Sequence, residues 1–271
     1  MNKAVRERLH LPLLLFILGA ALALRLYGIA WDGGYFFHPD ERQIMFIADM
    51  LSFPWPLDWS LLFSPESPWN PHFFAYGSFP IYLLRITAGI VKQFDSDFAI
   101  LRQGYVLGRA LSALFDVGTV YLIYRLGRKL HGKVVGLLSA ALLAFTVLHI
   151  QLAHFYTVDT VLVFFVVLTM SLCVDLFRRP SWNGAALPLG AAWGLALATK
   201  VSAAPLMVPI LLAWFFTALR RTKSADGEVS VHGTRRWFTA LGGLVLTGLM
   251  ALGVFLLCEP YAALDVGTFL V

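Results

Sequence analysis

The sequence is poor in charged residues, in cysteine and in the motifs of soluble enzymes. Asp, Glu, Lys and Arg make up only 14% of the 271 residues, whereas a typical soluble domain carries about 25%. The two cysteines, Cys173 and Cys258, lie inside apolar runs and give neither a disulfide framework nor a metal motif. The sequence has no Walker loop, no Gly-x-Ser-x-Gly motif and no Gly-x-Gly-x-x-Gly motif after a strand pattern. Chemistry on soluble nucleotides therefore has no motif to support it.

Long apolar runs are what the sequence has in abundance. Hydrophobic residues make up 59% of the chain, and a membrane-spanning helix needs about 20 mostly apolar residues. Because lipid offers the backbone no hydrogen-bond partners, such runs without strict alternation predict helices rather than barrel strands. We expect an all-α membrane protein with about seven transmembrane helices, at residues 11–30, 105–124, 134–153, 158–177, 185–199, 201–219 and 237–258.

The net charge of +5 follows the predicted topology. Of the 21 Lys and Arg residues, 14 fall before the first span or in alternate loops, and so on one side of a seven-helix protein. Basic loops mark the cytoplasmic side. No basic face with interleaved aromatics remains for nucleic acid. The first span lacks a small-residue cleavage site, so we expect a retained signal anchor with a cytoplasmic N-terminus.

Residues 31–104 form the largest predicted loop, which this topology places on the outer face. The loop holds eight acidic residues, seven prolines and many aromatics, so it is not a disordered linker. Residues 41–53 have apolar positions at helical spacing and predict an amphipathic helix on the membrane surface. Residues 73–91 are apolar, but Gly77 and Pro80 interrupt them, and a span here would place the downstream basic loops outside. We therefore expect an interfacial or re-entrant helix at 73–91.

Asp40 and Glu41 are the candidate catalytic residues, in the segment Phe37-His38-Pro39-Asp40-Glu41. A carboxylate in the outer loop can act as a general base that removes a proton from an acceptor hydroxyl. The competing interpretation is that both acids only favour the N-terminus of a helix electrostatically.

Arg109 and Lys200 are the candidate phosphate-binding residues. Arg109 lies near the outer end of the second span, where it can offer a forked donor to phosphate oxygens or simply snorkel. Lys200 is the only basic residue between Arg179 and Arg220, on the side expected to be poor in positive charge. It can act as a point charge for a phosphate, or snorkel in the same way. Asp116, deeper in the second span, is expected to be a buried structural partner of a polar group.

A second group of polar residues lies where the third span gives way to the fourth. His154, Tyr156 and Asp159 are candidate substrate contacts there, together with His38 of the outer loop. Asp159 has the alternative role of capping the fourth helix. A divalent metal bound by residues of this group is conceivable, but no His-Glu-x-x-His spacing supports it. We expect no required cofactor.

Five segments taken together resemble the GT-C membrane glycosyltransferases, in particular the protein O-mannosyltransferase-like family, with the aminoarabinose transferases as relatives. The segments are FHPDERQI (37–44), NPHFFAYGSFPIYLL (70–84), LGRALSALFD (107–116), HIQLAHFYTVDT (149–160) and GLALATKVSAAPL (194–206). The resemblance implies one seven-helix module over residues 1–271, a catalytic first outer loop, and a sugar carried on a polyprenyl phosphate. It implies Asp40 as the acidic residue of the outer loop, and Arg109 and Lys200 at the carrier phosphate. Asp159 corresponds to the carboxylate of the second outer loop.

The expected function is transfer of a sugar from this lipid carrier to an acceptor hydroxyl at the outer face of the plasma membrane. Members of the family continue beyond the seventh helix, so we expect a C-terminal remainder to be missing after Val271. The sugar and the acceptor stay open. The alternatives are a transporter or flippase of lipid-linked substrates, whose signature would be paired broken helices in two repeats, and a non-catalytic assembly subunit.

Overall fold

The computed structural model describes residues 3–178, 184–219 and 233–270, and these residues form helices and no strand. The long or medium helices are α1 (Lys3–Leu26), α2 (Pro39–Met50), α4 (Ser78–Val91), α5 (Tyr105–His131), α6 (Lys133–Ala144), α8 (Val158–Arg178), α9 (Ala186–Thr199), α10 (Met207–Leu219) and α11 (Gly233–Cys258). The short elements are α3 (Trp59–Leu62), η1 (Ser96–Phe98), η2 (Ile100–Gly104), α7 (Val147–Ala153), η3 (Val201–Leu206), α12 (Tyr261–Leu264) and α13 (Val266–Phe269). The all-helical fold class is confirmed.

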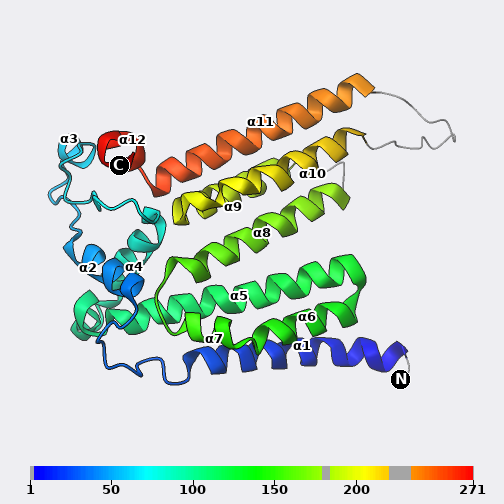
Figure 1. Ribbon diagram of the computed structural model, residues 1–271, viewed down its shortest axis with the longest axis horizontal. Coiled ribbons are helices and arrows are strands. Elements are labelled where there is room, and N and C mark those ends of the chain that lie inside the picture. Colours follow the sequence, from blue (N-terminus) through cyan, green and yellow to red (C-terminus); the bar gives the residue numbers. More distant parts are fainter. Residues whose placement is uncertain (1–2, 179–183, 220–232, 271) are drawn as a thin grey trace.

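The long helices lie side by side in one layered bundle (Figure 1). α1, α6, α9 and α11 run toward the end that carries α2, α3, α4 and α12, and α5, α8 and α10 run away from it. The turn before α8, the α9–η3 junction and the segment after α11 therefore all reach the same end as the loop after α1. We call this the loop end of the bundle.

Within the described residues, five helices are long and apolar enough to cross a membrane. They are Leu9–Leu26, Ile100–His131, Val158–Arg178, Val201–Leu219 and Arg236–Cys258. The expected span at 134–153 is a pair of helices, α6 and α7, bent by 58°. The break comes at Thr146, whose extended backbone ends the helical path. The expected span at 185–199 is α9, a shorter apolar helix that ends before Lys200, whose backbone is extended.

The helices approach each other closely where their side chains are small. A Cβ at Gly190 would lie 2.4 Å from the backbone oxygen of Thr247, and one at Gly194 would lie 2.5 Å from that of Ala251. Small residues at such positions are how membrane helices gain van der Waals contact, because lipid supplies no hydrophobic force between them. α9 and α11 are thus packed backbone to backbone, which fixes α9 and the lysine that follows it.

The loop at residues 31–104, called the outer loop after its predicted position, contains the helix predicted at 41–53, which the structure gives as α2. Its apolar face is buried against α4 in one cluster that includes Ile44, Ile47, Ile81 and Leu84. α2 is therefore held in place by the packing of its apolar face on α4. The segment predicted at 73–91 forms α4, which is too short to be counted among the candidate spans.

Asp116 is buried between α5 and its neighbours, as predicted. It accepts one hydrogen bond from Arg25 at the end of α1 and pairs with the ring of His149 in α7 at 2.6 Å. Arg25 also donates to the backbone oxygen of Ala144 at the end of α6. This network ties α1, α5, α6 and α7 together. The basic loop expected between 219 and 237 falls mostly on residues 220–232, outside the described residues.

Candidate functional site

Arg109 is the centre of a buried ionic network beneath the outer loop. Its guanidinium donates to both oxygens of Glu41, at 2.7 and 2.7 Å, and to both oxygens of Asp32, at 2.8 and 2.7 Å. It also donates to the backbone oxygen of Ile29 at 2.9 Å. The three side chains are 0% exposed. A guanidinium has five N–H donors in a fixed fork, and each one has a protein partner here.

The expected contact between Arg109 and a carrier phosphate does not fit this geometry. A phosphate could reach the guanidinium only by displacing a buried carboxylate that is bound through two hydrogen bonds. Breaking such a pair leaves an uncompensated charge in the interior. The network instead joins the loop after α1, through Asp32, to the first turn of α2, through Glu41. Burial raises the pKa of Asp32, but hydrogen bonds from Arg109 and Gly34 outweigh this and lower it overall.

Glu41 is fully buried, and both oxygens of its carboxylate are already bound by protein groups. Besides Arg109, its carboxylate accepts a hydrogen bond from the backbone N–H of Tyr156 at 2.9 Å. Tyr156 is itself fully buried, and its hydroxyl donates to the backbone oxygen of Pro80. Both residues are therefore structural in this arrangement, in contrast to the expected catalytic and substrate-binding positions. They fix the turn before α8 against α2 and α4.

Two of the predicted substrate contacts, His38 and His154, have polar contacts with backbone atoms of the protein. The Nδ1 atom of His38 accepts a hydrogen bond from the backbone N–H of Asp40, and so caps the N-terminus of α2. Asp40 and Glu41 lie in the first turn of this helix, and Pro39 is its first residue. The two ring nitrogens of His154 lie 2.7 and 2.8 Å from the backbone oxygens of Ile150 and Tyr27. One ring nitrogen of His38 and both ring nitrogens of His154 therefore have partners within the protein.

Asp40, Asp159 and Lys200 come together at the loop end, where each is partly exposed. The Nζ atom of Lys200 lies 3.7 Å from Oδ1 of Asp159, and the two side chains are 35% and 42% exposed. Asp40 lies close enough to Tyr76 for its charge to act on the hydroxyl of that residue, as the charge of Asp159 does. Lys200 lies 5.7 Å from the centre of the Tyr76 ring. We call these four residues the Asp40–Lys200 cluster.

Tyr76 was not among the residues expected from the sequence. Burial raises the pKa of Tyr76 to about 12, and the interaction with Asp40 and the charge of Asp159 act in the same direction. A phenol with this pKa stays protonated at physiological pH, so it can donate to a carboxylate but cannot serve as a base. The signal that could have found it is its position next to Gly77, in the segment 70–84.

Glu259 is a second unexpected group, located directly after α11. It is buried, and neither of its carboxylate oxygens has a hydrogen-bond partner among the described residues. Burial raises the pKa of Glu259 to about 8, although the nearby Ser78 partly offsets this rise. A carboxylic acid in such a place is largely protonated at neutral pH.

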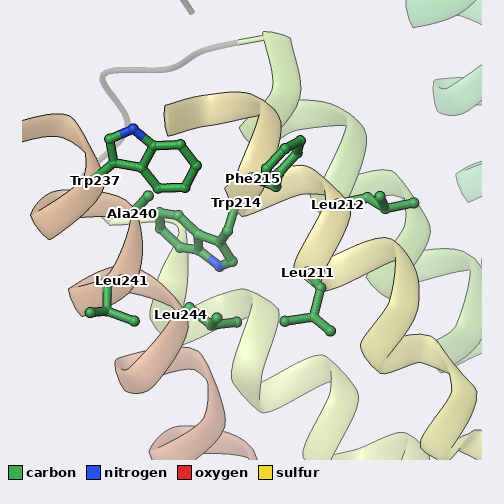
Figure 2. Close-up of a pocket in the computed structure, with 8 residues that line it drawn as sticks. All are labelled: Leu211, Leu212, Trp214, Phe215, Trp237, Ala240, Leu241 and Leu244. Carbon is green, nitrogen blue, oxygen red and sulfur yellow. The ribbon is translucent and has the colours of Figure 1, made fainter. Parts of the chain in front are cut away.

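The described residues form no cluster suited to a metal ion, and the cavity described next is apolar. In the part of the chain that the structure describes, no group of three or more His, Cys, Asp or Glu residues could hold a metal ion. A cavity of about 440 Å³ lies between α10 and α11 (Figure 2). Apolar and aromatic side chains line it: Leu211, Leu212, Trp214, Phe215, Trp237, Ala240, Leu241 and Leu244. It contains no carboxylate or amine, so it offers no group for acid–base chemistry.

Comparisons with known proteins point to one class of membrane enzymes. A family model described as dolichyl-phosphate-mannose-protein mannosyltransferase matches residues 98–232. No curated protein matches the chain. Among solved structures, the protein O-mannosyltransferase Pmt1–Pmt2 complex of S. cerevisiae, bound to the sugar donor, matches with a TM-score of 0.66 and 17% identity. The match covers 96% of this chain and 34% of that one.

A second match is the archaeal oligosaccharyltransferase AglB of Archaeoglobus fulgidus, solved with an inhibitory peptide and a dolichol-phosphate. The TM-score is 0.56, the identity is 16%, and the match covers 98% of this chain and 38% of that one. At these identities the likeness shows the fold alone. The chain spans little more than a third of the length of either solved structure. The family match and the two structures confirm the resemblance to the GT-C superfamily.

Proposed function

We propose that this chain, which resembles the GT-C superfamily, is the membrane module of a glycosyltransferase. The enzyme takes a single sugar from a polyprenyl-phosphate carrier and transfers it to an acceptor hydroxyl. The observation that carries this proposal is the Asp40–Lys200 cluster. It brings an accessible carboxylate and an accessible ammonium together at one end of a bundle of apolar helices. Such a carrier has its tail in lipid, its phosphate at headgroup depth and its sugar in water.

Asp40 is the proposed general base. In the reaction, the acceptor oxygen forms a bond to the anomeric carbon of the sugar, and the acceptor proton passes to the Asp40 carboxylate. The bond between the anomeric carbon and the phosphate oxygen breaks, and its electron pair leaves with the polyprenyl phosphate. That product gains one negative charge, which balances the proton taken up by Asp40. A positioned base typically contributes 10²–10⁴-fold in rate.

Glu41 is adjacent in sequence but unsuited to this role. Both of its oxygens are bound by Arg109, and its side chain is fully buried. Asp40 is partly exposed at the first turn of α2. One carboxylate of the pair can therefore anchor the helix while the other meets the acceptor.

Lys200 is the proposed cation for the carrier phosphate. It is partly exposed, and its contact with Asp159 is long, at 3.7 Å. An ammonium group has three donors, so this contact leaves donors for phosphate oxygens. A cation fixed where negative charge develops on the leaving group stabilises the transition state more than the ground state. Arg109 is left out of this role because all its donors are occupied.

The loop end is proposed to face outward from the plasma membrane, with the N-terminus on the cytoplasmic side. The distribution of basic residues supports this orientation. Cysteine labelling tests it in a chain whose Cys173 and Cys258 are replaced by alanine. A membrane-impermeant reagent added outside should label a cysteine at position 66 but not one at position 226. The reverse pattern would overturn the orientation.

A transfer assay with a radiolabelled polyprenyl-phosphate sugar tests the function, using the full-length protein. Asp40→Asn keeps the shape of the side chain but removes its basicity, so it should lower turnover by about 10²–10⁴-fold. Affinity for the donor lipid should stay within a few-fold of wild type. Asp49→Asn, an exposed carboxylate on the same helix, is the matched control and should retain turnover. Binding of the carrier without any sugar transfer in wild type would favour a transporter or an assembly subunit.

A further inference from the structure

The outer loop contains a hollow with aromatic walls and one carboxylate, apart from the Asp40–Lys200 cluster. Its volume is about 680 Å³. The residues that line it include three prolines, two tryptophans and one acid: Pro54, Pro56, Pro68, Trp55, Trp59 and Asp58. It lies at the loop end, where α3 is found next to α12 (Figure 1). We call it the Trp55–Trp59 hollow, and it shares no residue with the cluster.

Hydrogen bonds hold the segment around the Trp55–Trp59 hollow in one shape. The N–H of Ser52 donates to the backbone oxygen of Pro68 at 3.0 Å and so closes the loop between these two residues. The hydroxyl of Tyr261 donates to the backbone oxygen of Leu62 at 2.8 Å, which ties α3 to α12. The three prolines also fix their own backbone angles. The walls of the hollow are therefore preformed, as those of ligand sites usually are.

The two tryptophans present aromatic surface to the surroundings. Trp55 is 84% exposed and Trp59 is 62% exposed. Trp59 also stacks on Phe63, with ring centres 5.9 Å apart and planes inclined by 10°, and this contact fixes the orientation of its ring. Exposed apolar surface gathered in one place marks an interaction site.

Asp58 adds a negative charge to this aromatic surface. Its Oδ1 atom accepts hydrogen bonds from the Ser60 hydroxyl at 2.6 Å and from the N–H groups of Ser60 and Leu61 at 2.9 and 3.1 Å. The bond from the Ser60 hydroxyl contributes most to lowering the pKa of Asp58, so this carboxyl is ionised at neutral pH. Among the residues that the structure describes, no cation pairs with Asp58, and its Oδ2 atom has no partner.

The charge and the rings together favour one kind of ligand. Residues 54–68 contain Asp58 and Glu66 but no Lys, Arg or His. A carboxylate attracts a cation by its charge, and an indole ring attracts one by its negative face. A neutral sugar gains nothing from the charge, and an anion is repelled by it. Tryptophans that only anchor a protein at headgroup depth need no ionised carboxylate between them in the chain.

We propose that the Trp55–Trp59 hollow is a binding site for an organic ammonium group, which is held by the two indole faces and the carboxylate of Asp58. The group can belong to the headgroup of a membrane lipid or to a soluble molecule, since both sources offer the same chemistry. The inference does not depend on the proposed function, because neither Asp40 nor Lys200 takes part.

The test uses the full-length protein labelled with fluorotryptophan, in nanodiscs of phosphatidylglycerol, a lipid without an ammonium group. Fluorine NMR gives one signal for each of the eight tryptophans, and Trp55→Phe and Trp59→Phe assign the two signals of interest. Choline is the probe, titrated at constant ionic strength. Dimethylbutanol, the uncharged isostere of choline, is the matched control, and a methyl glycoside tests for a sugar site.

Choline should shift the signals of Trp55 and Trp59 saturably, with a dissociation constant on the order of millimolar, as expected for one exposed charge and two rings. Dimethylbutanol and the methyl glycoside should leave both signals in place. Equal shifts with choline and dimethylbutanol would show that the hollow recognises no charge. A response to the glycoside alone would indicate a carbohydrate site. Either of these results would overturn the proposal.

Asp58→Asn keeps the shape of the side chain but removes its charge, so choline affinity should fall by up to about fivefold. Glu66→Gln changes an exposed carboxylate of the same segment that does not line the hollow, and should bind as wild type does.

Trp59→Leu, followed through the Trp55 signal, should weaken choline binding by roughly 2- to 5-fold. Tyr35→Leu is its control, because Tyr35 is an aromatic residue of the outer loop that is 77% exposed and lies outside the hollow. Unchanged signals from the other tryptophans show that each variant is folded. Wild-type choline affinity in both Asp58→Asn and Trp59→Leu would contradict the site.

A change of headgroup tells the two sources of the ammonium group apart. In nanodiscs of phosphatidylcholine, a headgroup bound in the hollow would shift the same two signals without added choline and weaken the response to choline. If the signals and the choline affinity match those in phosphatidylglycerol, the site takes soluble cations. If both signals change with the bilayer while choline has no effect in phosphatidylglycerol, the two tryptophans are interfacial anchors and the proposal is wrong.

Discussion

Arg109 and Glu41 form a bidentate ion pair in which both N–O distances are 2.7 Å and neither side chain is exposed. Asp32 makes a second bidentate contact with the adjacent edge of the guanidinium, formed by its two terminal nitrogens. The charged part of α5 therefore binds protein carboxylates from two segments of the outer loop. It holds the first turn of α2, and with it the neighbouring Asp40, in place.

Arg109→Lys should destabilise the protein although it keeps the positive charge. An ammonium cannot make two parallel hydrogen bonds to each of two carboxylates, so buried acceptors would lose their partners. Breaking a buried ion pair typically costs about 3–5 kcal/mol. Thermal unfolding in detergent should therefore occur at a clearly lower temperature. Affinity for polyprenyl phosphate, measured on the folded protein, should change little.

Arg102→Lys is the matched control for this change. Arg102 pairs with Asp97 at 3.0 Å in the same loop, but both side chains are largely exposed. Exposed pairs contribute about 0–1 kcal/mol, so Arg102→Lys should leave the unfolding temperature nearly unchanged. If Arg109→Lys has normal stability but a sharply lower affinity for the carrier, the result would show that Arg109 binds the phosphate.

Lys200→Gln should weaken binding of polyprenyl phosphate with little effect on folding. Hydrogen bonds to charged groups contribute about 1.5–3 kcal/mol, which corresponds to roughly 10-fold to 10²-fold in affinity. The side chain is 35% exposed and its one ion pair is long, so little stability depends on it. Binding can be measured by calorimetry in lipid nanodiscs. Lys92→Gln, an exposed lysine at the end of α4, is the control and should bind as wild type does. Unchanged affinity in Lys200→Gln would remove the proposed phosphate site.

The contrast between Arg109 and Lys200 indicates how far sequence reasoning reaches in this protein. Apolar runs predict helices because lipid leaves the backbone no other way to satisfy its hydrogen bonds. That rule gave the all-helical class and the approximate position of each long helix. It could not find the bend at Thr146, since apolar residues stand directly on both sides of it and no proline or glycine marks the break.

The role of each charged residue depends on its partners in the fold, which can lie far away in the sequence. Both Arg109 and Lys200 are isolated basic residues near the ends of apolar runs. Only the fold reveals that Asp32 and Glu41, 77 and 68 residues earlier, occupy four of the five donors of Arg109. Tyr76 was missed for the same reason. A tyrosine in an aromatic loop carries no local sign that the fold will bring it to Asp40 and Lys200.

Glu259→Gln should change how stability depends on pH. The pKa of Glu259 is raised from an ordinary value of 4.5 to about 8 in the folded protein. Between these values the folded protein holds a proton that the unfolded chain has released, so its stability falls as pH rises. Below the window both states are protonated, and above it both are ionised. Glutamine has no such proton, so the variant should gain unfolding temperature relative to wild type across this window.

The measurement is the unfolding temperature of both proteins from pH 4.5 to pH 9. The difference between variant and wild type should grow up to about pH 8 and then become constant. Glu66→Gln, an exposed glutamate in the outer loop, should show no such trend. A constant difference at all pH values would mean that Glu259 is ionised in the folded protein.

Gly77→Ala should impair carrier binding and turnover together. The added methyl group would lie 1.9 Å from the backbone oxygen of Ala198, and backbone atoms cannot swing away as a flexible side chain can. The segment carrying Tyr76 must then separate from the end of α9 and lose the hydrogen bond from Gly77 to Thr199. Because Lys200 follows Thr199 directly, the contact between Lys200 and the Tyr76 ring is disturbed by the same movement.

Gly89→Ala distinguishes this steric effect from a general response of α4 to the substitution. Gly89 lies in the same helix, and a Cβ there meets nothing within 4 Å. Alanine in a helix interior is favoured over glycine by about 0.5–1 kcal/mol, so Gly89→Ala should unfold at the same or a higher temperature and keep full activity. The comparison is made on protein that has passed the same unfolding assay, so that misfolded material does not count as inactive. If folded Gly77→Ala transfers sugar at the wild-type rate, the contact between residues 77 and 199 does not position the cluster. If only turnover falls and carrier affinity is retained, the contact positions Tyr76 and Asp40 but not Lys200.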